Sequence, residues 1–407
     1  MHKGVVIAGA GQAGFQLAVS LRTEGFMGPV TLIGDEPELP YNRPPLSKAF
    51  LSGKESEFDL PFRPAEFYAA HDIRMRMGER VVALDVRGKS VEVDSGESIP
   101  YDFLALATGA RVRPIAVEPI AGVLYLRTLA DARQCKQLLD ASEALISIGA
   151  GFIGLEAAAA AAGKGKKVTV IAAEDRPMSR VVSPLVSEHF RRLHANHGVT
   201  LLLNEAVVRV DHGVRVHLGS GAIVEAPLVI AGIGVMPNIE LAADAGLRTA
   251  NGISVDEYLR TSDPSIFAIG DCAEHPNRFV PGGRGRIESI QNAVDQARAV
   301  ASTIAGKPRA YSAVPWFWTE QFDAKLQIAG ITAGCSDFVV RGDASSNSFS
   351  VFGFRADRLA AVESINRPVD HIHARKLLEA NAQLSPAQAA DETFPLKTLL
   401  SVKYQNS

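Results

Sequence analysis

VVIAGAGQAGF at residues 5–15 and LISIGAGFIGLE at residues 145–156 are the two stretches that decide the fold. In each, an apolar run typical of a β-strand leads into the pattern G-x-G-x-x-G, and an alanine-rich stretch follows. The glycines are Gly9, Gly11 and Gly14 in the first copy, and Gly149, Gly151 and Gly154 in the second. Such a loop turns a strand tightly into a helix and brings backbone N–H groups to a pyrophosphate. Two loops therefore predict two bound dinucleotides.

The repeat continues beyond the glycines. VTLI at residues 30–33 and VTVI at residues 168–171 give each copy a second β-type run after its helix. A single glycine-rich turn often serves only to join a strand to a helix, but two complete βαβ units are hard to obtain by chance. The sequence thus predicts an α/β fold with two Rossmann-like dinucleotide-binding domains.

The bulk composition is that of an ordinary globular protein. The chain has 407 residues, enough for about two to three domains, and its net charge is -3. This balance gives no global attraction to nucleic acid or to an anionic membrane, and we expect neither as a partner. Cys135, Cys272 and Cys335 lie far apart without a C-x-x-C or zinc spacing, which is typical of a reducing compartment. Because the apolar start of the chain reads as a strand and helix rather than a signal peptide, we expect a cytoplasmic protein.

The order of the predicted elements indicates three domains. The β-run LALATG ends in Gly109, a natural exit from the first domain. Residues 112–240 would form the second domain, after which the chain returns to the first, composed of residues 1–111 and 241–314. In residues 315–407, aromatic-rich strands alternate with turns and end in helices, which predicts a C-terminal α+β domain.

Nine motifs in order along the chain closely resemble the FAD-dependent ferredoxin reductases of the putidaredoxin reductase type. They are the glycine loops, PYNRPPLSK, LALATGA, LYLRT, GFIGLE, GIGVMPN, SIFAIGDCA, RIESIQNA and PWFWTEQ. The resemblance implies a glutathione-reductase-like fold, bound FAD, oxidation of NADH and transfer of single electrons to a [2Fe-2S] ferredoxin. That ferredoxin would supply a cytochrome P450 or an aromatic-ring dioxygenase. We expect no metal in the chain itself, and a monomer or weak dimer.

The resemblance also assigns residues to FAD. The first glycine loop would hold the pyrophosphate, Asp35 the adenosine ribose, and Asp271 the ribityl or pyrophosphate region. A solvated loop aspartate and a helix N-cap are the ordinary alternatives for these two acids. The other positions implied are Ala13, Val81, Ala107, Thr108, Gly109, Arg127, Gly270 and Ile290.

Three residues are predicted to be catalytic. The resemblance places Lys48, in PLSK, near N5 of the flavin and facing Glu156, in GLE. A cation there stabilises negative charge on the reduced flavin, and the carboxylate offsets the cost of burying the lysine. A surface lysine and a carboxylate near a helix N-terminus are the alternatives. Trp318 shares a strand face with Trp316 and would lie against the flavin, although a core or interface aromatic is an equal alternative.

The nucleotide site departs from the family pattern. Close members place a glutamate at the end of the second strand to bind the adenosine ribose, where this chain has Ala172; Glu174 follows two residues later. Lys164, Lys166 and Lys167 keep NADPH open, but no arginine or histidine replaces the acid, so we expect NADH to be preferred by a reduced margin. The other nucleotide positions implied are Gly149, Gly151, Phe152, Ile153, Gly154, Glu156 and Gly234.

Two other functions fit the same fold. A disulfide or peroxide reductase would need a reactive cysteine after the first βαβ unit, yet residues 36–60 contain none. A redox-responsive binding protein resembling apoptosis-inducing factor is the second alternative. Of the remaining polar clusters, we expect three histidines to lie on a solvated helix face and five basic residues to offer a docking patch for the ferredoxin. These are His189, His194 and His197, and Arg284, Arg286, Lys325, Lys397 and Lys403.

Overall fold

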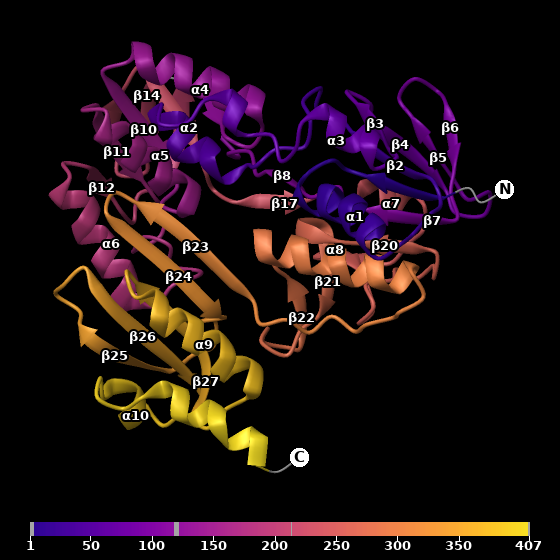
Figure 1. Ribbon diagram of the computed structural model, residues 1–407. Coiled ribbons are helices and arrows are strands. Elements are labelled where there is room, and N and C mark those ends of the chain that lie inside the picture. The colour runs from indigo at the N-terminus through magenta and orange to yellow at the C-terminus, as the bar shows by residue number, and fades with distance from the viewer. Residues whose placement is uncertain (1–3, 118–121, 213, 406–407) are drawn as a thin grey trace. The chain divides into compact units, whose positions relative to one another are not determined.

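The computed structural model describes residues 4–117, 122–212 and 214–405, with side chains described up to residue 400, and the chain divides into two compact units (Figure 1). Unit 1 comprises the described parts of residues 1–42, 60–111 and 236–315, and unit 2 those of residues 43–59, 112–235 and 316–407. The chain passes between the units after residues 42, 59, 111, 235 and 315. Two of these crossings fall within β8 (Ala110–Val112) and β17 (Val235–Pro237), which pair as a two-stranded sheet.

Unit 1 is built on a five-stranded parallel sheet. Its strands, in spatial order, are β20 (Ile266–Ala268), β7 (Phe103–Leu106), β1 (Val5–Ala8), β2 (Val30–Gly34) and β3 (Ile73–Met77). Every residue of β1 and β2 is buried, as their continuous apolar runs require in a sheet covered on both faces. Two helices, α1 (Gln12–Thr23) and α8 (Ile290–Ile304), pack against each other and against this core.

Smaller elements complete unit 1. The alternating runs after the first βαβ unit form a three-stranded antiparallel sheet, and a second small sheet precedes α8. The remaining elements are α3 (Ala65–Ala70), β4 (Val81–Asp85), β5 (Ser90–Val93), β6 (Ser98–Pro100), α7 (Glu240–Asp244), β18 (Thr249–Ala250), β19 (Gly252–Ser254), η3 (Gly270–Cys272), β21 (Ala273–Pro276) and β22 (Arg284–Arg286).

Unit 2 contains the second Rossmann-like sheet, which is also parallel. In spatial order its strands are β12 (Thr200–Leu202), β11 (Lys167–Ile171), β10 (Ala144–Ile148), β16 (Leu228–Ala231) and β9 (Val123–Tyr125). The flanking elements are η1 (Pro44–Ser47), α2 (Ala49–Ser52), η2 (Glu57–Asp59), α4 (Leu129–Ala141), α5 (Phe152–Gly163), α6 (Pro184–Asn196), and the small sheet β13 (Val207–Asp211), β14 (Arg215–Leu218) and β15 (Ile223–Glu225). Small alanine side chains let α5 lie close on β10 and β11.

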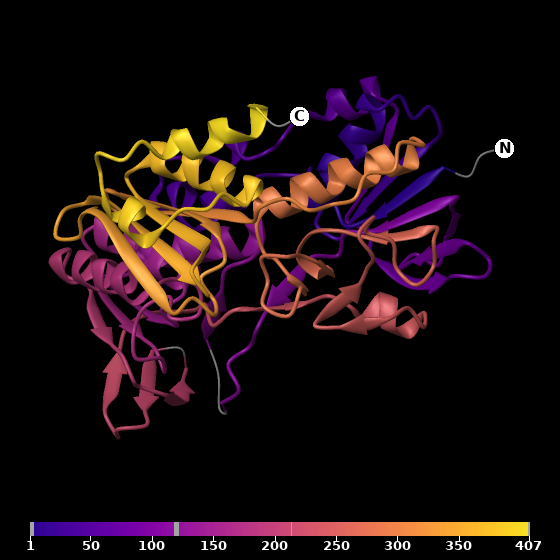
Figure 2. The same cartoon turned by 90° about the horizontal axis from the view of Figure 1, so that it is seen from below.

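The C-terminal part of unit 2 is a five-stranded antiparallel sheet. Its strands, in spatial order, are β23 (Trp316–Gln321), β24 (Ala324–Gly330), β27 (Arg358–Ile365), β26 (Ser348–Arg355) and β25 (Asp337–Asp343). Figures 1 and 2 show α9 (Pro368–Ala380), α10 (Pro386–Ala390) and η4 (Leu396–Gln405) along one face of it.

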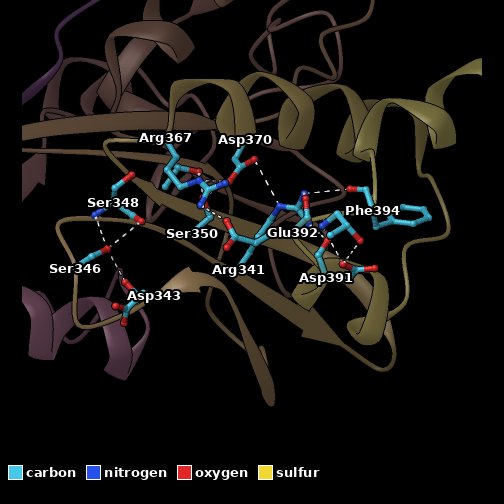
Figure 3. A network of polar contacts seen from close by, with 12 residues as sticks. Arg341, Asp343, Ser346, Ser348, Ser350, Arg367, Asp370, Asp391, Glu392 and Phe394 are labelled. Carbon is cyan, nitrogen blue, oxygen red and sulfur yellow. Dashed lines mark hydrogen bonds and ion pairs between the residues drawn. The ribbon is translucent and has the colours of Figure 1, made fainter.

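A buried arginine anchors the segment after α9 to this sheet (Figure 3). The guanidinium of Arg341, on β25, lies 3.7 Å from the carboxylate of Asp370. It donates hydrogen bonds to four backbone carbonyls, those of Ala389, Asp391, Glu392 and Phe394. Because each of these carbonyls belongs to the segment after α9, one side chain holds that segment against β25.

The predicted fold class is confirmed: two Rossmann-like α/β sheets and a C-terminal α+β part. The proposed domain boundaries remain a prediction, and residues 43–59, counted there with the first domain, group with unit 2 by contact. None of the helices in the described part of the chain is both long enough and apolar enough to cross a bilayer.

Candidate functional site

The three glycines of the first loop have different physical reasons to be glycine. A Cβ on Gly9, whose φ is +115°, would lie 2.2 Å from the carbonyl oxygen of Ala107, and one on Gly14 would lie 1.9 Å from the carbonyl oxygen of Gly9. Gly11 has an ordinary φ of -74°, and a Cβ there would meet no atom of the chain within 4 Å. It caps α1, and as a glycine it has no side chain that could accept from the N–H groups at that end. The open space in front of these donors fits a pyrophosphate.

The second loop repeats this arrangement in unit 2. Gly149 has φ +102° and would place a Cβ 2.5 Å from the carbonyl oxygen of Gly232, while a Cβ on Gly154 would lie 2.1 Å from the carbonyl oxygen of Gly149. A Cβ on Gly151 would make only an ordinary contact of 3.7 Å. Gly151 caps α5, again without a side-chain cap. Both loops therefore fit a dinucleotide phosphate by the same geometry.

Several positions assigned to FAD meet at one edge of the unit 1 sheet. Asp35 directly follows β2, residues 107–109 follow β7, and residues 270–271 follow β20. Since β2 and β7 flank β1 and β20 lies next to β7, the carboxyl ends of these parallel strands lie at the same edge as the first glycine loop, where ligands of such sheets bind. Ile290 begins α8, which packs on α1, and Val81 begins β4. Arg127, Lys48 and Trp318 belong to unit 2.

Two side chains hold the backbone around Asp271. Gln296, fully buried in α8, accepts a hydrogen bond of 2.7 Å from the N–H of Gly270, and Arg286 donates one of 3.0 Å to the carbonyl of Asp271. The side chain of Arg286 is only 9% exposed and pairs with Glu288 at 2.6 Å. Its prediction as a docking residue was therefore wrong, because its charge is committed inside unit 1. The side chain of Lys403, another docking candidate, lies outside the described residues.

The predicted pair of Lys48 and Glu156 is present in unit 2. Lys48 lies between η1 and α2, Glu156 lies in the second turn of α5, and Nζ of the lysine is 3.1 Å from Oε1 of the glutamate. The Glu156 side chain is 3% exposed and that of Lys48 19%. A lysine in a polar surface loop would not be held in this way, so the geometry favours the functional alternative for the pair.

Two hydroxyl groups complete the coordination of Glu156. Ser47 donates to Oε2 and Thr319, on β23, donates to Oε1, each at 2.5 Å. Burial raises the pKa of Glu156, and the lysine and both hydroxyls oppose this shift. No motif in the sequence predicts roles for Ser47 and Thr319, although each is the immediate neighbour of a predicted residue, Lys48 or Trp318.

The polar chain extends from Thr319 to α6. Gln321 donates to Oγ1 of Thr319 at 3.3 Å, and its own Oε1 lies 2.7 Å from Nε2 of His194. His194 is fully buried, and burial lowers its pKa to about 4, so the ring is neutral at pH 7. The predicted solvated helix face was therefore wrong for His194, which packs toward β23 instead.

Trp318 lies among aromatic side chains on β23. Its ring centroid is 5.6 Å from that of Trp316 and 6.3 Å from that of Phe317. Phe317 in turn stands 4.5 Å from Phe152, the first residue of α5. The shared face expected for the two tryptophans is thus present, and the contact with Phe152 joins the C-terminal sheet to the second glycine loop. Ile153, the next predicted residue, is exposed.

The residues at and after the end of β11 occupy the place where close family members have the ribose-binding glutamate. Ala172 is 2% exposed, and Glu174 forms an ion pair of 2.9 Å with Arg180. Arg176 donates hydrogen bonds to the carbonyls of Ser179 and Val182, so its guanidinium binds backbone groups of its own loop. Gly234 follows β16 with a φ of +109°.

The lysines considered for NADPH lie elsewhere in unit 2. Lys164 and Lys166 precede β11, and Lys167 is its first residue, whereas Glu174 lies beyond the last. A five-residue strand separates them by about 16 Å. Lys164 is also paired with Asp140 at 2.8 Å. Their position at the opposite end of the strand favours NADH, and the choice of nucleotide stays a prediction.

None of the three cysteines has the character of a redox thiol. Cys135 and Cys272 are fully buried, and all three are unpaired. Burial raises the pKa of Cys135 to about 12 and also raises those of Cys272 and Cys335. A thiol attacks as the thiolate, so these positions do not support a disulfide or peroxide reductase.

Comparisons with known proteins agree along the whole chain. A family model described as pyridine nucleotide-disulphide oxidoreductase matches residues 3–297, and one described as reductase C-terminal matches residues 316–400. Rhodocoxin reductase of Rhodococcus erythropolis is 49% identical over 405 residues, covering 98% of this chain and 94% of that protein. Putidaredoxin reductase of Pseudomonas putida is 38% identical over 408 residues, covering 98% and 96%.

Solved structures give the same result. A ferredoxin reductase from Rhodopseudomonas palustris superposes with a TM-score of 0.95 at 44% identity, covering 98% of this chain and 100% of that one. The reductase in a covalent putidaredoxin reductase–putidaredoxin complex superposes with a TM-score of 0.95 at 38% identity, covering 98% of each chain. The resemblance inferred from the nine motifs is confirmed.

Proposed function

The chain belongs to the pyridine nucleotide-disulphide oxidoreductase family, and we propose that it transfers electrons from NADH, through bound FAD, to a [2Fe-2S] ferredoxin. That ferredoxin supplies a cytochrome P450 or an aromatic-ring dioxygenase, in keeping with relatives named for the CYP199A2 system and for an anthranilate 1,2-dioxygenase system. The observation in the structure that carries the proposal is the buried Lys48–Glu156 pair. A disulfide reductase would also need a reactive thiol, and burial raises the pKa of each of the three cysteines.

The two glycine loops divide the cofactors between them. The first loop, with Asp35 and Asp271, would hold FAD, and the second, with Glu174, would hold NADH. FAD supplies the two-electron to one-electron conversion that links a hydride donor to an iron–sulfur cluster. Arg286 and Gln296 fix the backbone on either side of Asp271 and so keep its carboxylate in one place.

Lys48 and Glu156 would act by electrostatics. The ammonium group stabilises negative charge placed next to it, and the carboxylate 3.1 Å away holds the ammonium in one orientation. Ser47 and Thr319 hold the carboxylate in turn, so the lysine is positioned by residues of η1, α5 and β23 together. Removing the lysine charge should slow flavin reduction without abolishing nucleotide binding.

We further infer a preference for NADH and a cytoplasmic location. Glu174 provides an acid beyond the carboxyl end of β11, where the adenosine ribose would bind. The three lysines lie at the amino end of this strand, away from the position of a 2′-phosphate. Unpaired cysteines are typical of a reducing compartment.

The proposal is tested with purified holoprotein. NADH-driven reduction of a [2Fe-2S] ferredoxin, measured through cytochrome c, should be fast, whereas a disulfide substrate should not be reduced.

Anaerobic flavin reduction timed with each nucleotide should give a higher ratio of rate constant to Kd for NADH than for NADPH. Ala172→Glu should increase this preference for NADH by about ten- to a hundredfold. Slow turnover with every ferredoxin tried, together with a persistent charge-transfer band, would favour the binding-protein alternative.

A further inference from the structure

A second buried carboxylate lies in the C-terminal sheet, away from Lys48. Glu363, on β27, is 1% exposed, and its Oε1 accepts a hydrogen bond of 2.9 Å from the backbone N–H of Ser183. Oε2 is buried without a hydrogen-bond partner in the described part of the chain. The residues opposite Glu363 on the neighbouring strands are Ile328 and Val351. The sheet itself therefore gives no reason for a carboxylate, which is costly to bury.

The partner of Glu363 belongs to the loop of residues 172–183, which joins β11 to α6. Ser183 caps α6, because its hydroxyl accepts a hydrogen bond from the N–H of Val186. Two residues earlier, the carbonyl of Val181 accepts a hydrogen bond of 3.0 Å from the hydroxyl of Thr332. The C-terminal α+β part thus binds this loop at two points, Val181 and Ser183.

The same loop reaches the nucleotide end of the second Rossmann-like sheet. The N–H of Met178 donates a hydrogen bond of 2.9 Å to the carbonyl of Ala150, inside the second glycine loop. The Glu174–Arg180 ion pair stands on the loop as well. Arg176 ties the two halves of the loop together through the carbonyls of Ser179 and Val182. Movement at Ser183 is therefore passed to both groups over a few bonds.

We propose that Glu363 is a positioning residue for nucleotide binding: through the N–H of Ser183 it fixes the loop that carries Glu174 and Arg180. This inference rests on the proposed nucleotide site at the second glycine loop. Glu363 touches neither cofactor, and its effect is on the affinity for NADH rather than on the electron-transfer step. The C-terminal part thereby sets how well the nucleotide-binding part holds its ligand.

The protonation state of Glu363 gives this positioning a pH dependence. The charged group that faces it is Arg176 from the loop, and the titratable neighbour is the neutral thiol of Cys335, which itself faces Arg355. Burial raises the pKa of Glu363 to about 7, against the opposing effects of Ser183 and Arg176. A carboxylate accepts a hydrogen bond more strongly than a carboxylic acid does. The loop is held best above pH 7, and affinity for NADH should fall as the pH decreases through about 7.

The test compares Kd for NADH in holoprotein variants, obtained from anaerobic stopped-flow flavin reduction between pH 6 and pH 9. In the parent protein Kd should rise about three- to tenfold from pH 9 to pH 6. This is the change in affinity expected when one hydrogen bond is weakened. Glu363→Gln should show the weaker Kd at every pH, with a limiting reduction rate within about twofold of the parent. Thr332→Val removes the second anchor of the loop and should raise Kd while leaving the pH profile in place.

Two further variants distinguish a wrong assignment of the nucleotide site from a wrong role for Glu363. Ser364→Ala removes a buried polar contact on the opposite face of β27, where Ser364 bonds to Ser350, and should leave Kd and its pH profile unchanged. Glu174→Gln should raise Kd if the nucleotide site is correctly assigned. A Glu174→Gln protein with the parent Kd overturns that assignment. If Glu174→Gln weakens binding while Glu363→Gln keeps the parent Kd and profile, the positioning role alone is overturned.

Discussion

Unit 2 buries two carboxylates in different ways. Glu156 receives a lysine and two hydroxyl donors, so every one of its oxygens is bonded. Glu363 receives hydrogen bonding from Ser183 alone, and its second oxygen has no partner among the described residues. Burial raises the pKa of both, but only Glu156 has a cation in direct contact to offset it.

Glu156 is thus a carboxylate bonded on both oxygens beside a catalytic cation, whereas Glu363 is a carboxylate whose pKa lies near neutral pH. In the Lys48–Glu156 pair the carboxylate is held by a cation and two hydroxyl donors, which suits a group that must meet a reacting centre in one geometry. An unsatisfied carboxylate changes its protonation near neutral pH, which suits control of a neighbouring loop. Four substitutions sharpen or break this contrast.

The largest effect is expected from Lys48→Met. Removing the cation leaves Glu156 as an uncompensated buried charge, which costs about 3–5 kcal/mol in the free energy of unfolding at pH 8. Urea unfolding of the holoprotein measures this loss, and Lys48→Met combined with Glu156→Gln should recover most of it. Equal stabilities of the single and double variants would mean that Glu156 needs no cation, and the contrast with Glu363 would disappear.

Glu363→Gln should act in the opposite direction. The folded-state pKa of about 7 lies above the ordinary value near 4.5, so the stability that the neutral acid contributes is complete below pH 4.5 and is lost as the pH rises through 7. At pH 8.5 the glutamine variant should therefore be more stable than the parent by up to about 3 kcal/mol. At pH 4 the two should unfold at similar urea concentrations. A destabilised variant at pH 8.5 would place Glu363 in the same class as Glu156.

Thr319→Val should have an intermediate effect. It removes one charge-assisted hydrogen bond to Glu156 and leaves Lys48 in place, so about 1.5–3 kcal/mol of stability should be lost at pH 8. Ser47→Ala, which removes the other hydroxyl, provides the matched comparison. If flavin reduction by NADH slows in Thr319→Val but not in Ser47→Ala, the bond from β23 is the one that orients the pair.

The smallest effect is expected from Cys335→Ser, which changes a neighbour of Glu363. The thiol is neutral at pH 7 because its pKa is raised, so its replacement should alter unfolding by less than about 0.5 kcal/mol. Replacing all three cysteines by serine should likewise leave ferredoxin reduction within a few-fold of the parent. Loss of activity with FAD still bound would show that a thiol takes part after all.

The repeated glycine pattern was enough to predict the two Rossmann-like sheets, because the tight turn from strand to helix that the glycines allow is written in a few consecutive residues. Gly9 and Gly149 both adopt a positive φ at the end of a strand, and this is encoded within a few residues. The Lys48–Glu156 pair was predictable only through family resemblance, since 108 positions of sequence separate two residues that meet in space.

The rest of the site depends on long-range packing that no local pattern contains. Thr319 reaches Glu156 because β23 lies against α5, and Ser183 reaches Glu363 because β27 lies against the loop before α6. His194 is a residue for which the local pattern gave a wrong prediction for the same reason. Its spacing from His189 and His197 is typical of a solvated helix face, but contact with Gln321 buries it.

The glycine loops also bear on how this enzyme can diverge. At Gly9 and Gly14, and at Gly149 and Gly154, any side chain would collide with the chain's own backbone, so a saturation library should return only glycine among folded proteins. At Gly11 the fold itself tolerates alanine, and only the dinucleotide selects against it. A lineage that no longer needed FAD would be free to change residue 11 first. That position is therefore an early genetic marker of a reductase turning into a cofactor-free relative.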